Sequence, residues 1–225
     1  MLKLTPLLLA ALYGFAVYHF SAWRTAKELD AKSTEMVDLG LKRLTDQMAA
    51  ALGLPRIKVF IYDIAPVNGL AAPDGRIFIT KGFYDRYRNG DVTGPEMASV
   101  IAHELGHVAL GHARRRMIDF SGQNALRTAI VMVLGRFLPG VGPLVANALI
   151  GLVAARLSRA DEYEADAYAS ALLIKSGIGT AAQISLFRKL GALTGGGGTA
   201  PAWLLTHPKT DERIAAIQAN AAKWG

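Results

Sequence analysis

Two histidines and a glutamate lie close together in the stretch Ala102–Ala113, which reads AHELGHVALGHA. His103, Glu104 and His107 have the order H-E-x-x-H. Residues four positions apart on a helix face the same side, so both imidazoles can bind one metal ion from one direction. Zinc accepts nitrogen ligands, and a catalytic zinc has three protein ligands plus a water molecule. Glu104 can act as general base toward that water, as in zinc-dependent hydrolases.

The residues around this pattern favour a metal site over a chance match. They are largely apolar, which predicts that the helix is mostly buried. The apolar residues are Val100, Ile101, Leu105, Val108 and Leu110. Buried imidazoles and carboxylates are unfavourable unless each finds a partner. The competing interpretation is a buried helix whose histidines only pack. A metal ion would supply the missing partner.

The helix that carries the pattern has a defined start. Thr93-Gly-Pro-Glu96 has the form of a capping box with proline in the first turn. The sequence therefore predicts a helix from Gly94 towards Met117. His103 and His107 would lie well inside it, in a rigid element that suits a preorganised site.

The position of His112 does not favour it as the third ligand. It follows His107 by five positions, which is about 140° around a helix. The extended zincin pattern H-E-x-x-H-x-x-G-x-x-H would need its last histidine at residue 113, which is an alanine. A structural role is the preferred interpretation of His112.

An acidic cluster is the better source of the third ligand. Asp161, Glu162, Glu164 and Asp166 open a predicted helix. Glu162 and Asp166 are four apart and share a face, so one can bind the metal while the other hydrogen-bonds a ligand histidine. Asp161 and Glu164 can instead be solvated charges at the start of the helix.

Two β-rich segments precede the histidine helix. Ile57–Ile64 and Arg76–Thr80 are predicted strands, and Asp74-Gly75 is a turn signal. Together they predict a short antiparallel sheet. A free outer strand can pair with an extended peptide through main-chain hydrogen bonds, although an ordinary hairpin would give the same pattern.

Helical patterns fill most of the remaining chain. They are predicted over Thr25–Leu52 (ended by Gly53–Pro55), Ser158–Lys175, Thr180–Gly195 and Lys209–Ala222. The apolar region Ala125–Leu157 is interrupted by glycine and proline, which favours a helical hairpin, with a membrane-dipping element or lid as the alternative. Four glycines, Gly195–Gly198, predict a flexible loop.

The N-terminal segment Leu4–Trp23 has no Asp, Glu, Lys or Arg and ends in aromatic residues. About 20 apolar residues can span a bilayer, and aromatic residues favour its interface. We predict an uncleaved, single-pass membrane anchor over residues 1–24, in a bacterial inner membrane, and one domain over residues 25–225. A cleaved signal peptide is the alternative, but its apolar region is usually shorter and ends in small residues.

The composition limits which metal ligands and which binding partners we expect. The chain has 225 residues and no cysteine, so a metal must be held by histidine and carboxylate. Its net charge of +7 favours contact with anionic lipid or serves solubility. The basic run Arg114–Arg116 lacks interleaved aromatic residues, so we expect no nucleic-acid partner. The predicted fold class is α+β and mostly helical.

Three motifs in order, HELGH, SRADEYEADAY and THPKTDER, resemble the M48 family of zinc metalloproteases, which includes the Ste24, HtpX, Oma1 and BepA types. The resemblance implies a zincin-like domain with one Zn²⁺ per chain. It implies that Glu162 is the third zinc ligand and Asp166 its partner, and that His207 and Arg213 lie near the zinc and act in catalysis. The resemblance also places Asn68, Ile77, Phe78 and Ile79 along the substrate cleft.

The resemblance implies an endopeptidase that cleaves unfolded or membrane-associated polypeptides in protein quality control. The chain departs from particular members, because it has one predicted span where HtpX and Ste24 types have several, and it lacks the helical repeats of BepA. Their specific roles are therefore not expected here. The alternative function is a chaperone or binding module that has a protease-like but closed or idle zinc site.

Overall fold

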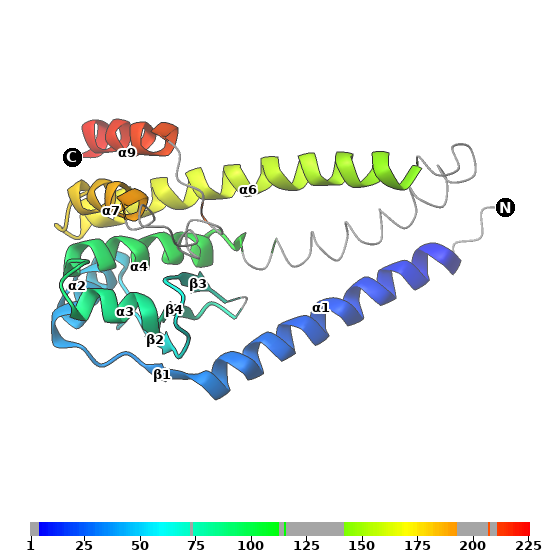
Figure 1. The fold of residues 1–225 in the computed structure, drawn as a ribbon, viewed down its shortest axis with the longest axis horizontal. Helices are drawn as coiled ribbons and strands as arrows, with labels where there is room; N and C mark the ends of the chain where they lie inside the picture. The colour runs from blue at the N-terminus through cyan, green and yellow to red at the C-terminus, as the bar shows by residue number, and fades with distance from the viewer. Residues whose placement is uncertain (1–4, 73, 113–114, 116–141, 193–206, 208–210) are drawn as a thin grey trace.

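The computed structural model describes residues 5–72, 74–112, 115, 142–192, 207 and 211–225 (Figure 1). This part is mostly helical, as predicted, with one small sheet. Its elements are α1 (Thr5–Lys32), β1 (Ser33–Glu35), α2 (Leu39–Leu52), β2 (Val59–Tyr62), β3 (Gly69–Ala71), β4 (Ile77–Thr80), α3 (Lys81–Arg88), α4 (Gly94–Ala109), α6 (Gly142–Lys175), α7 (Ala181–Ala192) and α9 (Asp211–Trp224).

The sheet is mixed, and the prediction of an antiparallel sheet is wrong in this respect. Its strand order is β1-β2-β4-β3. The two predicted strands, β2 and β4, pair in parallel, while β3 is the antiparallel hairpin partner of β4. The turn at Asp74-Gly75 serves that hairpin, and Gly75 has a φ of 87° there. Because β3 occupies one edge of β4, β2 pairs with the other edge.

The predicted continuous helix over Thr25–Leu52 is interrupted. α1 ends at Lys32, β1 pairs antiparallel with β2, and α2 begins only at Leu39. The Asp38 side chain accepts a hydrogen bond from the Leu41 N–H, which caps the new helix. Gly53 ends α2 in the left-handed conformation, at the predicted position.

The C-terminal end of α1 packs on the sheet. Leu29 is buried with Ala72 and Phe78, and the Tyr62 hydroxyl donates to Glu28 at 2.9 Å. Earlier in α1, large apolar side chains are more than half exposed: Leu12, Tyr13, Phe15, Phe20 and Trp23. Among the residues that the structure describes, we find no helix with both the length and the apolar content needed to cross a membrane. The structure thus does not support the predicted spanning helix.

α4 lies between the sheet and α6 (Figure 1). Its capping box is present as predicted: Thr93 accepts from the Glu96 N–H, and Glu96 accepts from the Thr93 N–H at 2.8 Å. The helix ends at Ala109, earlier than predicted, because Gly111 turns the chain with a φ of 69°. Residues 96–107 are all buried, as expected for a helix between two layers.

α6 is one helix from Gly142 to Lys175, so the predicted helix start at Ser158 is wrong. No glycine or proline lies between Gly151 and Lys175 to stop the helix. For the predicted hairpin or lid over Ala125–Leu157, residues 125–141 lie outside the described part, and residues 142–157 belong to α6. The predicted loop Gly195–Gly198 also lies outside it.

Candidate metal centre

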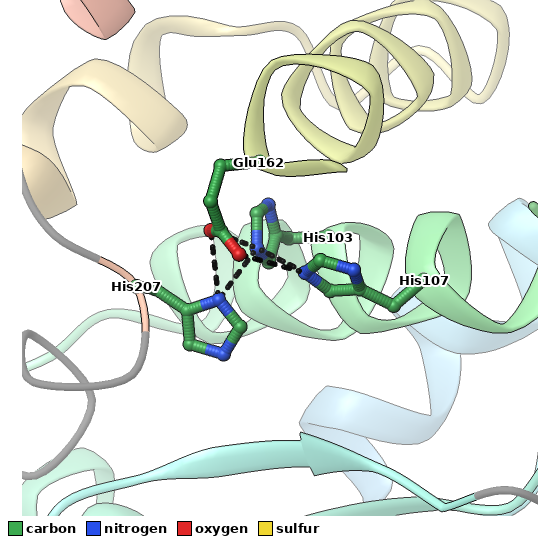
Figure 2. Close-up of side chains that lie close together, drawn as sticks. All are labelled: His103, His107, Glu162 and His207. Atoms are coloured by element: carbon green, nitrogen blue, oxygen red, sulfur yellow. Dashed lines mark hydrogen bonds and ion pairs between the residues drawn. The ribbon is translucent and has the colours of Figure 1, made fainter. Parts of the chain in front are cut away.

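His103 and His107 lie one turn apart on α4 and point toward α6 (Figure 2). Their Nε2 atoms are 3.0 Å apart. The burial of α4 fixes both rings, each of which is at most 3% exposed. Two nitrogen atoms thus face a common point from one helix.

Glu162 reaches the same point from α6. The two helices approach closely at Gly106, where a Cβ atom would meet the Cα and carbonyl oxygen of Ala165 at 3.0 Å. This glycine lets α4 and α6 pack backbone to backbone. The Glu162 carboxylate then lies 3.4 Å from His103 Nε2 and 3.5 Å from His107 Nε2.

His207 adds a fourth donor from a segment between α7 and α9. Its Nδ1 lies 2.8 Å from Glu162 Oε2 and 3.3 Å from His103 Nε2. One donor atom from each of His103, His107, Glu162 and His207 lies within 4.8 Å of the others. Figure 2 shows the four side chains converging from three separate segments of the chain.

The donor set fits zinc. Three imidazole nitrogens and one carboxylate match the ligands and the number of a tetrahedral zinc site. A second observation that supports a metal site is Glu104 Oε1, which is buried and has no hydrogen-bond partner among the described residues. It lies 3.6 Å from His207 Nε2. A buried carboxylate oxygen that lacks a hydrogen bond is unfavourable, so Glu104 is a candidate to hydrogen-bond a water molecule at a bound metal.

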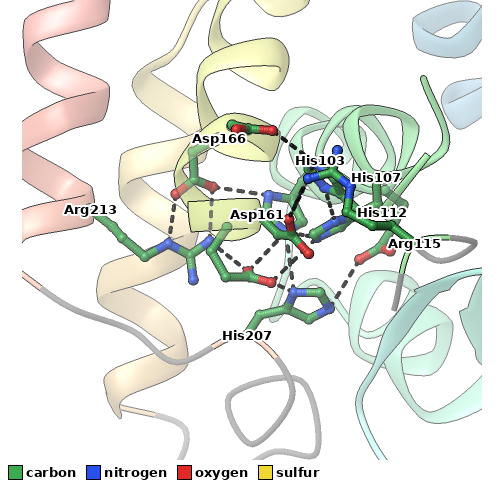
Figure 3. A network of polar contacts seen from close by, with 11 residues as sticks. His103, His107, His112, Arg115, Asp161, Asp166, His207 and Arg213 are labelled. Atoms are coloured by element: carbon green, nitrogen blue, oxygen red, sulfur yellow. Dashed lines mark hydrogen bonds and ion pairs between the residues drawn. The ribbon is translucent and has the colours of Figure 1, made fainter. Parts of the chain in front are cut away.

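Asp166 and Arg213 orient His103 (Figure 3). The His103 Nδ1–H donates to Asp166 at 3.0 Å, which leaves the Nε2 lone pair toward the metal centre. Arg213 donates two hydrogen bonds to Asp166, at 2.6 and 2.9 Å, and its Nη2 lies 3.3 Å from Glu162. In the structure the Arg213 guanidinium therefore binds the two carboxylates of α6.

The charges of the cluster favour the binding of a cation. Burial acts to lower the pKa of His103, but hydrogen bonds to Asp166 and Glu162 and the charge of Glu104 outweigh it and raise the pKa to about 9. Burial acts to raise the pKa of Glu162, and its hydrogen bonds to His103 and His207 prevail and lower it. The carboxylates thus stay ionised, and a divalent cation neutralises them more fully than one proton.

The predicted cleft residues lie in β4 and immediately before β3, and those in β4 are not at a free edge. Ile77, Phe78 and Ile79 form the interior strand β4 and are at most 2% exposed. Asn68 immediately precedes β3, where its backbone carbonyl accepts from the Thr80 N–H at 2.9 Å. The edge strand next to α4 is β3.

Gly69, the first residue of β3, was missed in the sequence analysis. A Cβ atom there would lie 2.9 Å from Val100 Cγ1 and 3.2 Å from Glu104 Oε1. β3 therefore runs directly past Glu104. A glycine inside a strand pattern often marks such a close approach, and Asn68-Gly69 offered that signal.

His112 lies next to the four donors, with its Nδ1 2.8 Å from Nδ1 of His107. It belongs to a second group with Asp161 and Glu164. The sequence analysis placed it on another face because it assumed that the helix continued. The turn at Gly111 returns the chain toward α4 and α6.

A buried cluster that could hold a metal, with the H-E-x-x-H helix, a carboxylate from a second helix and a neighbouring glutamate, is typical of a metalloprotease site. The comparison with protein families agrees: residues 36–221 match the model of Peptidase family M48. The chain therefore belongs to the M48 family of metalloproteases, and the resemblance found in the sequence is confirmed.

Individual relatives carry the same activity in their names. The chain is 33% identical over 205 residues to the Metalloprotease LoiP of Escherichia coli, covering 87% of this chain and 77% of that protein. It is 31% identical over 162 residues to the Metalloprotease YcaL of the same organism, covering 72% and 61%. It is 28% identical over 165 residues to the Mitochondrial metalloendopeptidase OMA1 of Arabidopsis thaliana, covering 72% and 31%.

Proposed function

We propose that this M48 metalloprotease is a zinc-dependent endopeptidase that hydrolyses peptide bonds of unfolded or membrane-associated polypeptides. The observation that carries the proposal is the convergence of His103, His107 and Glu162, together with the buried Glu104 oxygen that has no hydrogen bond among the described residues. The names of three relatives, two metalloproteases and a metalloendopeptidase, support it.

Each residue of the site has a separate role in the proposed reaction. His103, His107 and Glu162 would hold the zinc, and Asp166 and Arg213 would keep His103 and Glu162 in place. A bound zinc ion supplies a Lewis acid and lowers the pKa of water. Glu104 takes the proton of the attacking water and passes it to the leaving amine. His207 is the candidate donor to the oxyanion that develops on the scissile carbonyl.

The substrate would bind along β3. This strand is short, lies at the edge of the described sheet, and passes Glu104 at Gly69. An extended peptide that pairs with β3 would bring its main chain next to the general base. Main-chain pairing accepts many sequences but requires an unfolded segment, which is why we propose unfolded polypeptides as the substrate class.

Membrane attachment is the second part of the proposal. The exposed apolar and aromatic side chains of α1 and the net charge of +7 support contact with an anionic lipid surface. We retain the single-pass anchor in a bacterial inner membrane as a proposal. Extraction of membranes with alkaline carbonate tests it: a spanning chain stays in the pellet, and release into the supernatant would refute the anchor.

The decisive experiment concerns Glu104. The zinc-loaded full chain should cleave unfolded casein, and a chelator should stop it. Glu104→Gln should retain zinc but lose cleavage by at least about 100-fold, because general-base catalysis typically contributes a factor of 10²–10⁴. Glu35→Gln, an exposed glutamate paired with Arg56, is the control. Cleavage by Glu104→Gln at the parental rate would disprove the assignment.

The alternative is a binding or chaperone module whose zinc site is closed. The observation that favours it is His207, which takes the fourth donor position beside Glu162. With His207 in place, a substrate carbonyl has no vacant ligand position. His207→Ala distinguishes the two: an enzyme that opens on its own needs His207 and loses activity, whereas a site held closed by His207 gains cleavage in the variant.

A further inference from the structure

A second cluster of ionisable side chains adjoins the metal centre, and the proposed mechanism does not use it. His112 is fully buried at the turn that follows α4. Its Nδ1 lies 2.8 Å from His107 Nδ1. Its Nε2 lies 3.1 Å from Glu164 Oε2 and 3.7 Å from Asp161 Oδ1, and Arg115 Nη1 approaches Asp161 at 3.3 Å (Figure 3).

The hydrogen bonds of His112 determine where its proton lies. A carboxylate only accepts hydrogen bonds, so His112 Nε2 must carry the proton that it donates to Glu164. Neutral His112 then has a lone pair at Nδ1. The 2.8 Å contact with His107 needs one proton between the two Nδ1 atoms, and that proton must belong to His107.

This chain of hydrogen bonds fixes the tautomer of a metal ligand. With its proton on Nδ1, His107 presents its Nε2 lone pair toward His103 Nε2 and Glu162, where the metal would lie. We propose that His112 is a positioning residue that holds His107 in its metal-binding tautomer and that Glu164 and Asp161 in turn hold His112. The inference rests on the zinc site of the proposed function.

The same contacts exclude the competing interpretation of this cluster as a second metal site. A cation on His112 Nε2 would move the ring proton to Nδ1, which would then donate to His107 Nδ1. Neutral His107 would carry its proton on Nε2 and could no longer bind the first metal through that atom. Arg115 also already provides positive charge to Asp161.

The two ligand histidines are thus held in comparable ways from the same helix. Asp166, on α6, accepts the Nδ1 proton of His103, and Arg213 secures Asp166. His112 accepts the Nδ1 proton of His107, and Glu164, also on α6, secures His112. Such partners of metal-binding histidines typically contribute a factor of 10–100 in metal affinity.

Zinc affinity of the full chain tests the proposal through a pair of variants. His112→Phe keeps a ring but offers no acceptor, so zinc should bind about 10- to 100-fold more weakly in competition with a chelator. His112→Gln offers a carbonyl oxygen to His107 Nδ1–H and should regain most of the affinity. If the parent binds zinc and His112→Phe binds it equally tightly, the positioning role is wrong; if the parent binds no zinc, the proposed function fails as well.

A milder substitution and a direct measurement guard against misfolded variants. Glu164 is about half exposed, so Glu164→Ala should fold and lose zinc affinity several-fold, with Glu35→Ala as the matched control. ¹⁵N NMR of the histidine-labelled, zinc-loaded parent should show His112 protonated at Nε2 and unprotonated at Nδ1, and His107 protonated at Nδ1. A proton on His112 Nδ1 would overturn the proposal without any variant.

Discussion

Glu162 and Asp166 are four residues apart on α6, yet their surroundings differ. Glu162 faces His103, His107 and His207, whose nitrogens point toward the metal centre. Asp166 faces His103 Nδ1 and the Arg213 guanidinium, which already satisfy its oxygens. Glu162 thus lies among the candidate metal donors, although it also contacts His207 and Arg213, whereas both oxygens of Asp166 are bound by His103 and Arg213.

The two carboxylates should therefore respond differently to substitution. Glu162→Gln removes a charged zinc ligand and should leave a purified protein with little or no zinc. Asp166→Asn keeps an acceptor for His103 and should weaken zinc binding by only about 10- to 100-fold. Metal content and chelator competition measure both. Equal losses in the two variants would contradict the assignment of Glu162 as a ligand.

Gly69 gives a second prediction for a single side chain. In Gly69→Ala, the new Cβ would crowd Val100 and Glu104, and a displaced general base should lower the cleavage rate roughly 10-fold or more. Zinc content should not change, because Glu104 is not a ligand. The reciprocal change Ala71→Gly in the same strand is the control, and unchanged cleavage by Gly69→Ala would argue against a cleft along β3.

The residues of the metal centre differed in how far the sequence could predict them. The spacing of His103 and His107 points to a shared helix face, and the acidic cluster supplied a partner. Spacing alone could not choose between Glu162 and Asp166, because that choice depends on where Arg213 lies. Gly69 and the contact of His112 with His107 depend on tertiary packing and on a turn, which local periodicity does not describe.

The start of α4 anchors the histidine helix to α7. Glu96 caps α4 and also accepts hydrogen bonds from the Ser185 hydroxyl at 2.6 Å and the Lys189 ammonium at 2.8 Å. Burial acts to raise the pKa of Glu96, but these hydrogen bonds and those from Thr93 outweigh it, so the pKa lies below its usual 4.5. The ionised form of the Glu96 carboxylate therefore stabilises the folded chain.

The lowered pKa of Glu96 predicts that the free energy of unfolding depends on pH. A group whose pKa is lower in the folded state stabilises above its unfolded pKa and loses that contribution as the pH falls through its folded pKa. Glu96→Gln should thus lower the free energy of unfolding by about 1–3 kcal/mol at pH 7, and the difference from the parent should shrink below pH 4.5. Denaturant unfolding of the two metal-free proteins measures it. A difference independent of pH would contradict the role of the charge.

The sequence predicted elements better than it predicted their pairing. The capping box and Gly53 mark helix ends through local hydrogen bonds and backbone conformation, and both are found where expected. The sheet topology was missed because β3 has only three residues, Gly69–Ala71, and gives little periodic signal. Once β3 takes the hairpin position, the parallel pairing of β2 with β4 follows.

In the whole molecule, the metal donors come from segments that are far apart in the sequence. His103 is 59 residues from Glu162 and 104 residues from His207. A cation that binds all of them binds only the folded chain, so metal binding and folding are coupled.

Removal of zinc should therefore destabilise the protein. With free zinc at about 1,000 times the dissociation constant, binding contributes about 4 kcal/mol, and a chain of this size should lose roughly 10 °C in Tm on chelation. Differential scanning calorimetry with and without chelator measures this shift. Glu162→Gln should show almost none, and a shift as large as that of the parent would mean that zinc stabilises the fold elsewhere.

The strand that follows α1 links the N-terminal helix, through the sheet, to the strand beside Glu104. β1 hydrogen-bonds to β2, β2 to β4, and β4 to β3, which passes Glu104. Among the side chains that the structure describes, Glu28 and Leu29 at the end of α1 contact the sheet, so the direction of this helix depends on the same sheet that would receive a peptide. Whatever holds the far end of α1 would thereby fix the direction from which substrates approach, and shortening the chain beyond Leu29 would damage the cleft itself.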